Sequence, residues 1–349
     1  MRSGLAALAV VVAACSSGTP SATPKPAASV AAREAAPPSA PPVEAGADPA
    51  PVDAGAASAL LVPPRIPGDE VAAVLWPDEA TARARAASCA PGEELAHVRC
   101  MLEARYAGDG EALELASVLY TSFGSVAGVE EAHTMDGGYR GRIRIEPELP
   151  VGRERKHLGW VVSAMRDFDA FFVALAPPAE ARTYRFRGIS FRFMRSVAKR
   201  TPTAYAHDWT IAYNLSGSLL VSEDATRETL FHEMFHLNDG ARSWWSTRVL
   251  DGVYDAVVQK CRTDAACLAP YAPTETIVRG GTYYAFQPGN GVVEYAAELA
   301  LRYYREQRNV MRGTSKGRSF KCGPPQNERA WVQLRDEFFG GVDKVAACR

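Results

Sequence analysis

The stretch LFHEMFHLND, at residues 230–239, constrains the fold of this chain more than any other part of its sequence. It contains the pattern His-Glu-x-x-His as His232, Glu233 and His236, set among apolar residues. The surrounding pattern predicts a helix over residues 224–237. On a helix the two histidines lie one turn apart on one face, so both imidazoles can bind the same metal ion.

Short polar residues mark both ends of this predicted helix. Ser222 or Asp224 can cap its first turn, and the Asn-Asp-Gly sequence at 238–240 is a stop signal. Arg227 and Glu228 are expected on its exposed face. The motif therefore lies on a helix whose start and end are both indicated by the sequence.

Two imidazoles and a neighbouring carboxylate are the residue types of a hydrolytic zinc centre. The neutral nitrogens of His232 and His236 would bind the ion, and Glu233 would be the general base that activates water. The alternative is a pair of core histidines satisfied by hydrogen bonds. A catalytic zinc ion needs a further protein ligand, so the rest of the sequence must supply one.

A candidate third ligand lies in GNGVVEYAAELALRYY, at residues 289–304. After a glycine-containing turn, a helix is expected to place Glu294 and Glu298 on one face, four residues apart. One carboxylate can complete a His-His-Glu site while the other orients a ligating histidine, and the spacing leaves open which does which. Both acids could instead lie on a solvated face, but the small apolar residues around them favour the metal site.

Together, HEMFHLND and EYAAELA resemble the gluzincin metallopeptidases, most nearly the branch with the catalytic domain of anthrax lethal factor and the secreted Pro-Pro endopeptidases. The resemblance covers residues 209–304 and nothing in the N-terminal half. It implies that Glu294 binds zinc and that Glu298 orients a histidine. It also implies a zincin-like fold, with a small mixed sheet, an active-site helix and a helical C-terminal half.

The same resemblance implies a tyrosine that stabilises the oxyanion of the reaction. Tyr283 and Tyr284 lie slightly further upstream of Glu294 than the tyrosine of that branch, and the expected position holds Gln287. Tyr284 is the preferred candidate. The alternative is a tyrosine that only packs in a loop.

These residues lead us to expect a zinc-dependent endopeptidase that hydrolyses extracytoplasmic proteins, with Zn2+ as cofactor. Its partners would be peptide or protein substrates, proline-rich ones among them, and a strand within residues 210–221 would offer its edge to an extended peptide. Asp239 is expected to orient the zinc ligands without binding the ion itself. One alternative is a zinc amidase acting on cell-wall peptides. Another is an inactive surface binding lipoprotein, whose structural zinc would need a fourth ligand such as Asp239 or His207.

The N-terminal residues predict export and a lipid anchor. We expect residues 1–14 to be a signal peptide, because their apolar run is shorter than the roughly 20 residues that span a bilayer. The sequence before Cys15 resembles a bacterial lipobox, so Cys15 is expected to carry lipid; an ordinary signal peptide is the alternative. The Ala/Pro-rich residues 15–66 would then be a disordered tether to the cell envelope, at the outer membrane in a Gram-negative host.

The cysteine content agrees with an exported protein, and the net charge argues against nucleic-acid binding. Six further cysteines indicate disulfides, and proximity favours the pairs Cys89–Cys100, Cys261–Cys267 and Cys322–Cys348. A formal net charge of −1 provides no global field for nucleic acid, which we do not expect as a partner.

The order of the expected elements indicates the α+β class. Helices are expected at residues 95–106, 111–123 and 157–175, and strands at 140–150, 184–194 and, as a short pair, within 208–222. The globular region would divide into an N-terminal part, 67–205, and a catalytic region, 206–349.

Overall fold

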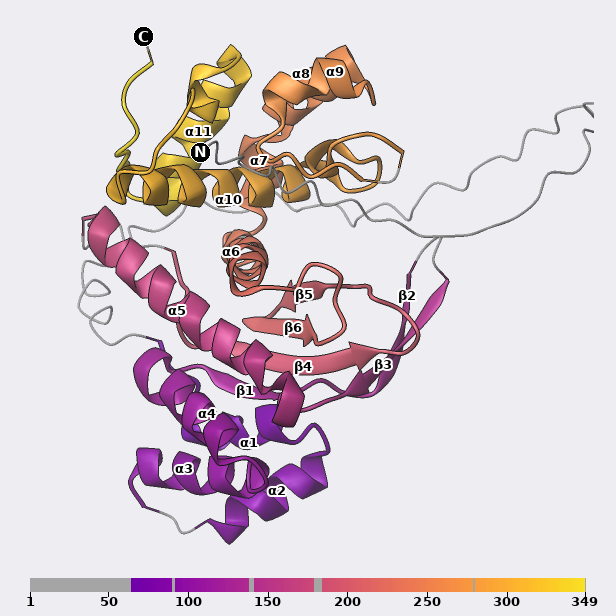
Figure 1. The fold of residues 1–349 in the computed structure, drawn as a ribbon, viewed down its shortest axis with the longest axis vertical. Helices are drawn as coiled ribbons and strands as arrows, with labels where there is room; N and C mark the ends of the chain where they lie inside the picture. Colours follow the sequence, from indigo (N-terminus) through magenta and orange to yellow (C-terminus); the bar gives the residue numbers. More distant parts are fainter. Residues whose placement is uncertain (1–63, 90–91, 138–140, 179–183, 279, 349) are drawn as a thin grey trace, which may run out of the picture.

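A mixed sheet of six strands lies between a group of N-terminal helices and the helical C-terminal half (Figure 1). The computed structural model describes residues 64–348 except 90–91, 138–140, 179–183 and 279. The predicted α+β class is confirmed. The expected signal peptide, Cys15 and all but the last residues of the tether lie outside the described residues.

The N-terminal helices support one face of the sheet. They are α1 (Gly68–Leu75), α2 (Glu79–Ser88), α3 (Glu94–Arg105) and α4 (Gly110–Phe123). The helices expected at 95–106 and 111–123 correspond to α3 and α4. Asp109 caps α4 by accepting a hydrogen bond from the Ala112 amide at 3.1 Å. Gly124 ends it with φ at 64°, close to the backbone of Arg65, where a larger side chain would collide.

The sheet is built around its longest strand, β4. Its strands are β1 (Val126–Val129), β2 (His133–Asp136), β3 (Arg142–Pro147), β4 (Ser190–Ser196), β5 (Ala204–His207) and β6 (Thr210–Asn214). β4 pairs in parallel with β1 and β6 and antiparallel with β3. β2 joins β3 at one edge, and β5 pairs antiparallel with β6 at the other.

The strand expected at 140–150 corresponds to β3, but two other strand predictions need correction. The strand expected at 184–194 begins only at Ser190, because Gly188 turns the backbone with φ at 64°. Only one strand forms within 208–222, since the Gly217 amide donates to the Asn214 carbonyl at 2.7 Å and closes a turn. The partner strand is β5, which precedes β6, so the edge is Ala204–His207.

The long helix α5 (Arg155–Leu175) packs against α4 and α6 (Glu223–Gly240) (Figure 1). It corresponds to the helix expected at 157–175. Phe171 of α5 contacts Phe231 of α6 and Tyr304, with ring centroids 6.3 and 4.8 Å apart. One buried apolar cluster therefore includes residues from both the N-terminal part and the expected catalytic region.

The C-terminal half is helical. It contains α7 (Trp245–Val249), α8 (Asp251–Cys261), α9 (Ala265–Leu268), α10 (Gly291–Met311) and α11 (Pro325–Phe338), with short 3-10 turns η5 (Ala269–Tyr271), η6 (Tyr284–Phe286) and η7 (Phe320–Cys322). The three predicted disulfides all form: Cys89–Cys100, Cys261–Cys267 and Cys322–Cys348. Among the residues that the structure describes, no helix has the length and apolar character needed to cross a bilayer.

Candidate metal centre

Helix α6 carries the His-Glu-x-x-His motif and is held at both ends. Ser222 caps it by accepting a hydrogen bond from the Ala225 amide at 3.2 Å. The stop expected at 238–240 is too early, because α6 runs through Gly240. The reason is that Asn238 is held inside the fold: its Nδ2 donates to the carbonyl oxygens of Met234 and Arg185, each at 2.8 Å.

The face of α6 that carries Arg227 is buried, contrary to the expected exposure. Its guanidinium pairs with Asp224 at 2.7 Å and lies 3.8 Å from Asp167 of α5. Glu228 is only half-buried and pairs with Arg305 of α10. Helices α5 and α10 cover this side of α6, which the polar character of its residues did not indicate.

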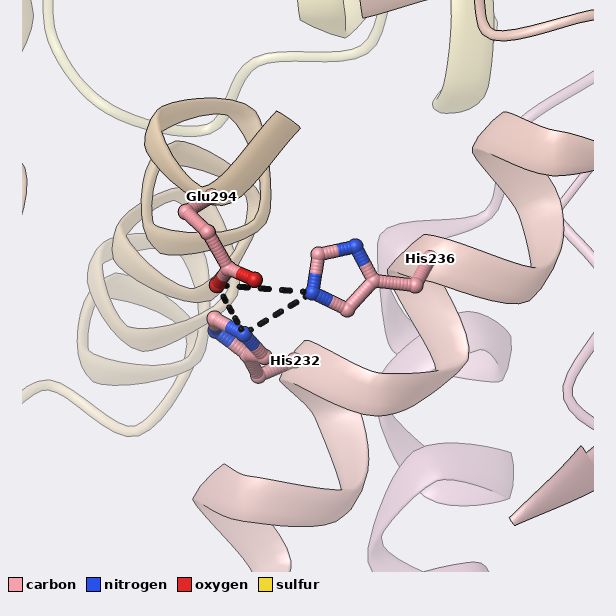
Figure 2. Close-up of side chains that lie close together, drawn as sticks. All are labelled: His232, His236 and Glu294. Atoms are coloured by element: carbon pink, nitrogen blue, oxygen red, sulfur yellow. Dashed lines mark hydrogen bonds and ion pairs between the residues drawn. The ribbon is translucent and has the colours of Figure 1, made fainter. Parts of the chain in front are cut away.

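His232 and His236 point from α6 toward Glu294 on α10 (Figure 2). The two Nε2 atoms lie 3.0 Å apart, and Glu294 Oε2 lies 3.1 Å from Nε2 of His232 and 3.6 Å from Nε2 of His236. A tetrahedral zinc site with bonds of about 2.0–2.1 Å has ligand atoms about 3.3 Å apart. The three ligand atoms therefore have the mutual spacing that a zinc ion requires.

The ligand set has three members. Among the described residues, His232, His236 and Glu294 form the one group of acids, histidines or cysteines that could hold a metal ion. The described cysteines are bonded in disulfides and offer no thiolate. His207 is exposed at the end of β5, with Nδ1 3.7 Å from Asp208, and does not join the group. Three protein ligands are typical of a catalytic zinc site, whereas a structural site has four.

Glu298 lies one helical turn after Glu294 and is 5% exposed. Its Oε1 lies 2.9 Å from Nδ1 of His232 and accepts a hydrogen bond from it. This bond directs the other ring nitrogen, Nε2, toward Glu294. Burial opposes a charge on His232, but hydrogen bonds and ion pairing with Glu294 and Glu298 raise the pKa of its imidazole well above the ordinary value. The carboxylates of Glu294 and Glu298 thus stabilise a positive charge at the position of the His232 imidazole.

Glu233 lies beside the ligands on α6 and is 9% exposed. Burial raises the pKa of its carboxyl, and the neighbouring His232 and His236 oppose that rise. A carboxylate with a raised pKa is a better proton acceptor near neutral pH. The environment of Glu233 therefore suits the role of general base expected for it.

The structure brings Tyr284 into the site. Its hydroxyl donates to Glu294 Oε2 at 2.9 Å, and its ring centroid lies 6.1 Å from that of His232. Burial and the negative charge of Glu294 raise the pKa of Tyr284, so the hydroxyl keeps its proton. Tyr283 instead pairs its backbone with Ile277 and packs against the core.

Asp239 is fully buried near the end of α6. Its Oδ1 accepts a hydrogen bond from the Ser246 amide at 2.8 Å, and its Oδ2 accepts one from the Ser246 hydroxyl. These bonds connect α6 to α7. A contribution of Asp239 to the orientation of the zinc ligands stays a prediction.

Thr274 also belongs to the site, and sequence analysis missed it. It lies between η5 and η6, and its hydroxyl donates to Glu298 Oε2. A single threonine in a loop has no spacing that would distinguish it, so only its position in the fold reveals this contact.

No protein-family model, curated protein or solved structure matches the chain. The gluzincin resemblance therefore rests on the two sequence motifs and stays a prediction. Independently of that resemblance, the structure places His232, His236 and Glu294 in a group that could hold a metal ion.

Proposed function

We propose that this protein is a zinc-dependent endopeptidase with a zincin-like catalytic region. The observation that carries the proposal is the convergence of three ligand atoms from two helices, His232 and His236 on α6 and Glu294 on α10. Glu233 lies beside these ligands, and Glu298 holds one of them in place. A pair of core histidines would need neither the facing carboxylate nor the acid between them.

Zinc fits the donor set of two imidazole nitrogens and one carboxylate oxygen. His232, His236 and Glu294 would hold the ion, since their ligand atoms lie 3.0 to 3.6 Å apart. When bound, zinc supplies Lewis-acid chemistry that polarises a carbonyl and lowers the pKa of water toward about 7.

The surrounding residues move protons and stabilise charge. Glu233 accepts a proton from the water that attacks the scissile carbonyl and passes it to the leaving amine. The Tyr284 hydroxyl would exchange its hydrogen bond to Glu294 Oε2 for one to the developing oxyanion, and its raised pKa keeps the hydroxyl protonated for this role. Glu298 keeps His232 oriented through the Nδ1 hydrogen bond.

Strand β5 is the proposed place where an extended substrate binds. It is an edge strand that packs against α6, and within the described part of the chain it pairs with β6 alone. A peptide could add to it through main-chain hydrogen bonds and pass along the motif helix. Peptides and proteins are therefore the substrate class that we propose, and the inclusion of proline-rich ones rests on the resemblance to the Pro-Pro endopeptidase branch.

We place this activity outside the cytoplasm. The three disulfides favour an oxidising compartment, where such bonds persist. A lipid on Cys15 would anchor the enzyme to the cell envelope through the tether. This anchor rests on the sequence alone.

The decisive experiment measures zinc content and peptidase activity of the full chain. About one zinc per chain is expected in the wild type and in Glu233→Gln, but only the wild type should hydrolyse a library of extended peptides. Loss of the general base should reduce the rate by roughly 100- to 10,000-fold. Glu328→Gln, which changes an exposed glutamate of α11, is the matched control and should behave as the wild type.

Two results would contradict the proposal. Full activity of Glu233→Gln with zinc still bound would exclude Glu233 as the base. A folded wild type that takes up no zinc would leave the motif as a structural histidine pair. The peptide library should include cell-wall peptides, because a zinc amidase would use the same residues.

A further inference from the structure

We propose that Thr274 is a positioning residue that holds the Glu298 carboxylate and, through it, the zinc ligand His232. The inference deepens the proposed function and rests on it for the identity of the metal. Its structural part, a hydrogen-bonded chain Thr274–Glu298–His232, exists whether or not a metal is bound.

Each oxygen of the Glu298 carboxylate has its own donor. Oε1 accepts from His232 Nδ1 at 2.9 Å, and Oε2 accepts from the Thr274 hydroxyl. Glu298 is 5% exposed and Thr274 is 3% exposed, so water cannot readily replace either donor. A buried carboxylate with one unsatisfied oxygen is costly, and it would rotate or take up a proton to find another partner.

The orientation of this carboxylate matters because His232 follows it. The imidazole is directed by its Nδ1–H bond, which aims Nε2 at the point shared with His236 and Glu294. Any rotation of Glu298 would turn this ring and move one ligand atom out of the triangle. Thr274 therefore acts on the metal ligand from two bonds away, without touching the metal position.

The segment that carries Thr274 is anchored to α10, the helix that carries both glutamates. The Pro273 carbonyl accepts from Arg302 of α10 at 3.4 Å, and within the segment the Tyr284 amide donates to the Thr276 carbonyl at 2.8 Å. One loop thus brings Thr274 to Glu298 and Tyr284 to Glu294. Thr274 and Tyr284 therefore both contact carboxylates of the metal centre.

The variants that test this role differ by one hydroxyl group. Thr274→Val removes the donor and keeps the shape, whereas Thr274→Ser keeps the donor. Thr282→Val is the matched control, because Thr282 is buried in the same loop and its hydroxyl has no hydrogen-bond partner among the described residues. Each variant is made in the full chain, and its zinc affinity is measured by competition with a chelator.

Thr274→Val should bind zinc about tenfold more weakly, the lower end of the effect of outer-shell partners. Thr274→Ser and Thr282→Val should bind zinc as the wild type does. Equal zinc affinity in wild type and Thr274→Val would overturn the inference, and so would a failure of Thr274→Ser to restore the affinity. If Thr274→Val does not fold, Thr274→Ala is measured in its place against the same serine variant.

A second measurement separates this inference from the proposed function. In metal-free protein labelled with 15N-histidine, the Nδ1–H proton of His232 should be protected from exchange by Glu298. Thr274→Val should weaken this protection and Thr282→Val should not. If the wild type binds no zinc, the proposed function fails, and this signal alone then decides the role of Thr274. Unchanged protection in Thr274→Val would overturn that role.

Discussion

Two buried histidines of this protein each lie beside a glutamate, and only one belongs to the candidate metal group. His232 pairs with Glu298 and Glu294, and its Nε2 faces the Nε2 of His236. His157, at the start of α5, lies with Nε2 3.4 Å from Glu154. Its Nδ1 lies 2.9 Å from the Tyr213 hydroxyl, so both of its nitrogens face groups of the protein.

The two sites shift the pKa of their histidines in opposite directions. Burial lowers the pKa of His157 to about 4, since the negative charges of Glu154 and Glu148 do not offset the lost solvation and the positive charges of Lys156 and Arg195 add to the lowering. At His232 burial acts in the same direction, but two carboxylates outweigh it and raise the pKa. A histidine next to a glutamate is therefore not a metal site by itself. A metal site also needs a second imidazole and a carboxylate aimed at the same point.

The largest effect on zinc affinity is expected for Glu294→Gln, which removes the proposed carboxylate ligand. The His157 site has no equivalent of this ligand. Zinc affinity should fall by more than about 100-fold, beyond the range seen for outer partners of a ligand. Competition with a chelator measures the loss, and Glu328→Gln serves as the unaffected control. Retention of zinc in Glu294→Gln would mean that Glu294 is not a ligand.

A smaller loss is expected for Glu298→Gln, which keeps the shape of the side chain and removes its charge. The His232 ring would be held less firmly, so zinc affinity should fall by about 10- to 100-fold. The same competition assay reports it. A loss greater than that of Glu294→Gln would reverse the roles assigned to the two glutamates.

His157→Gln should leave zinc affinity unchanged and reduce the free energy of unfolding. The buried Tyr213 hydroxyl would lose its partner at 2.9 Å and keep the Thr226 hydroxyl at 3.3 Å, so the change should cost about 0.5–1.5 kcal/mol, the net contribution of one hydrogen bond. Chemical denaturation measures the change. A drop in zinc affinity would instead connect this histidine to the metal centre and remove the contrast between the two sites.

The last expected effect is a pH dependence of stability carried by His157. Its pKa is about 4 in the folded state and near 6.5 in the unfolded chain, so the unfolded state binds more protons between these values. The stability due to neutral His157 is thus complete above about pH 6.5 and is lost as the pH falls toward about 4. The melting temperatures of metal-free wild type and His157→Gln should therefore converge over this interval, and a constant difference would contradict the prediction.

The local elements with strong patterns could be read from the sequence. The periodicity of α3, α4, α5 and α6 predicted helices close to those observed, and cysteine proximity predicted the three disulfides. These features depend on residues near one another in the chain. Strand pairing depends on residues far apart, which is why β5 was missed and the edge of the sheet was misplaced.

At the site, the sequence alone determined that His232 and His236 share a helical face with Glu233 next to them. Only the tertiary structure decided which oxygen of α10 meets which nitrogen, because spacing puts Glu294 and Glu298 on the same face. The packing of α10 against α6 separates them: Glu294 meets the two Nε2 atoms, and Glu298 meets Nδ1 behind the ring. Thr274 entered the site in the same way, since loop residues acquire partners through the path of the chain in space and carry no repeat that foretells it.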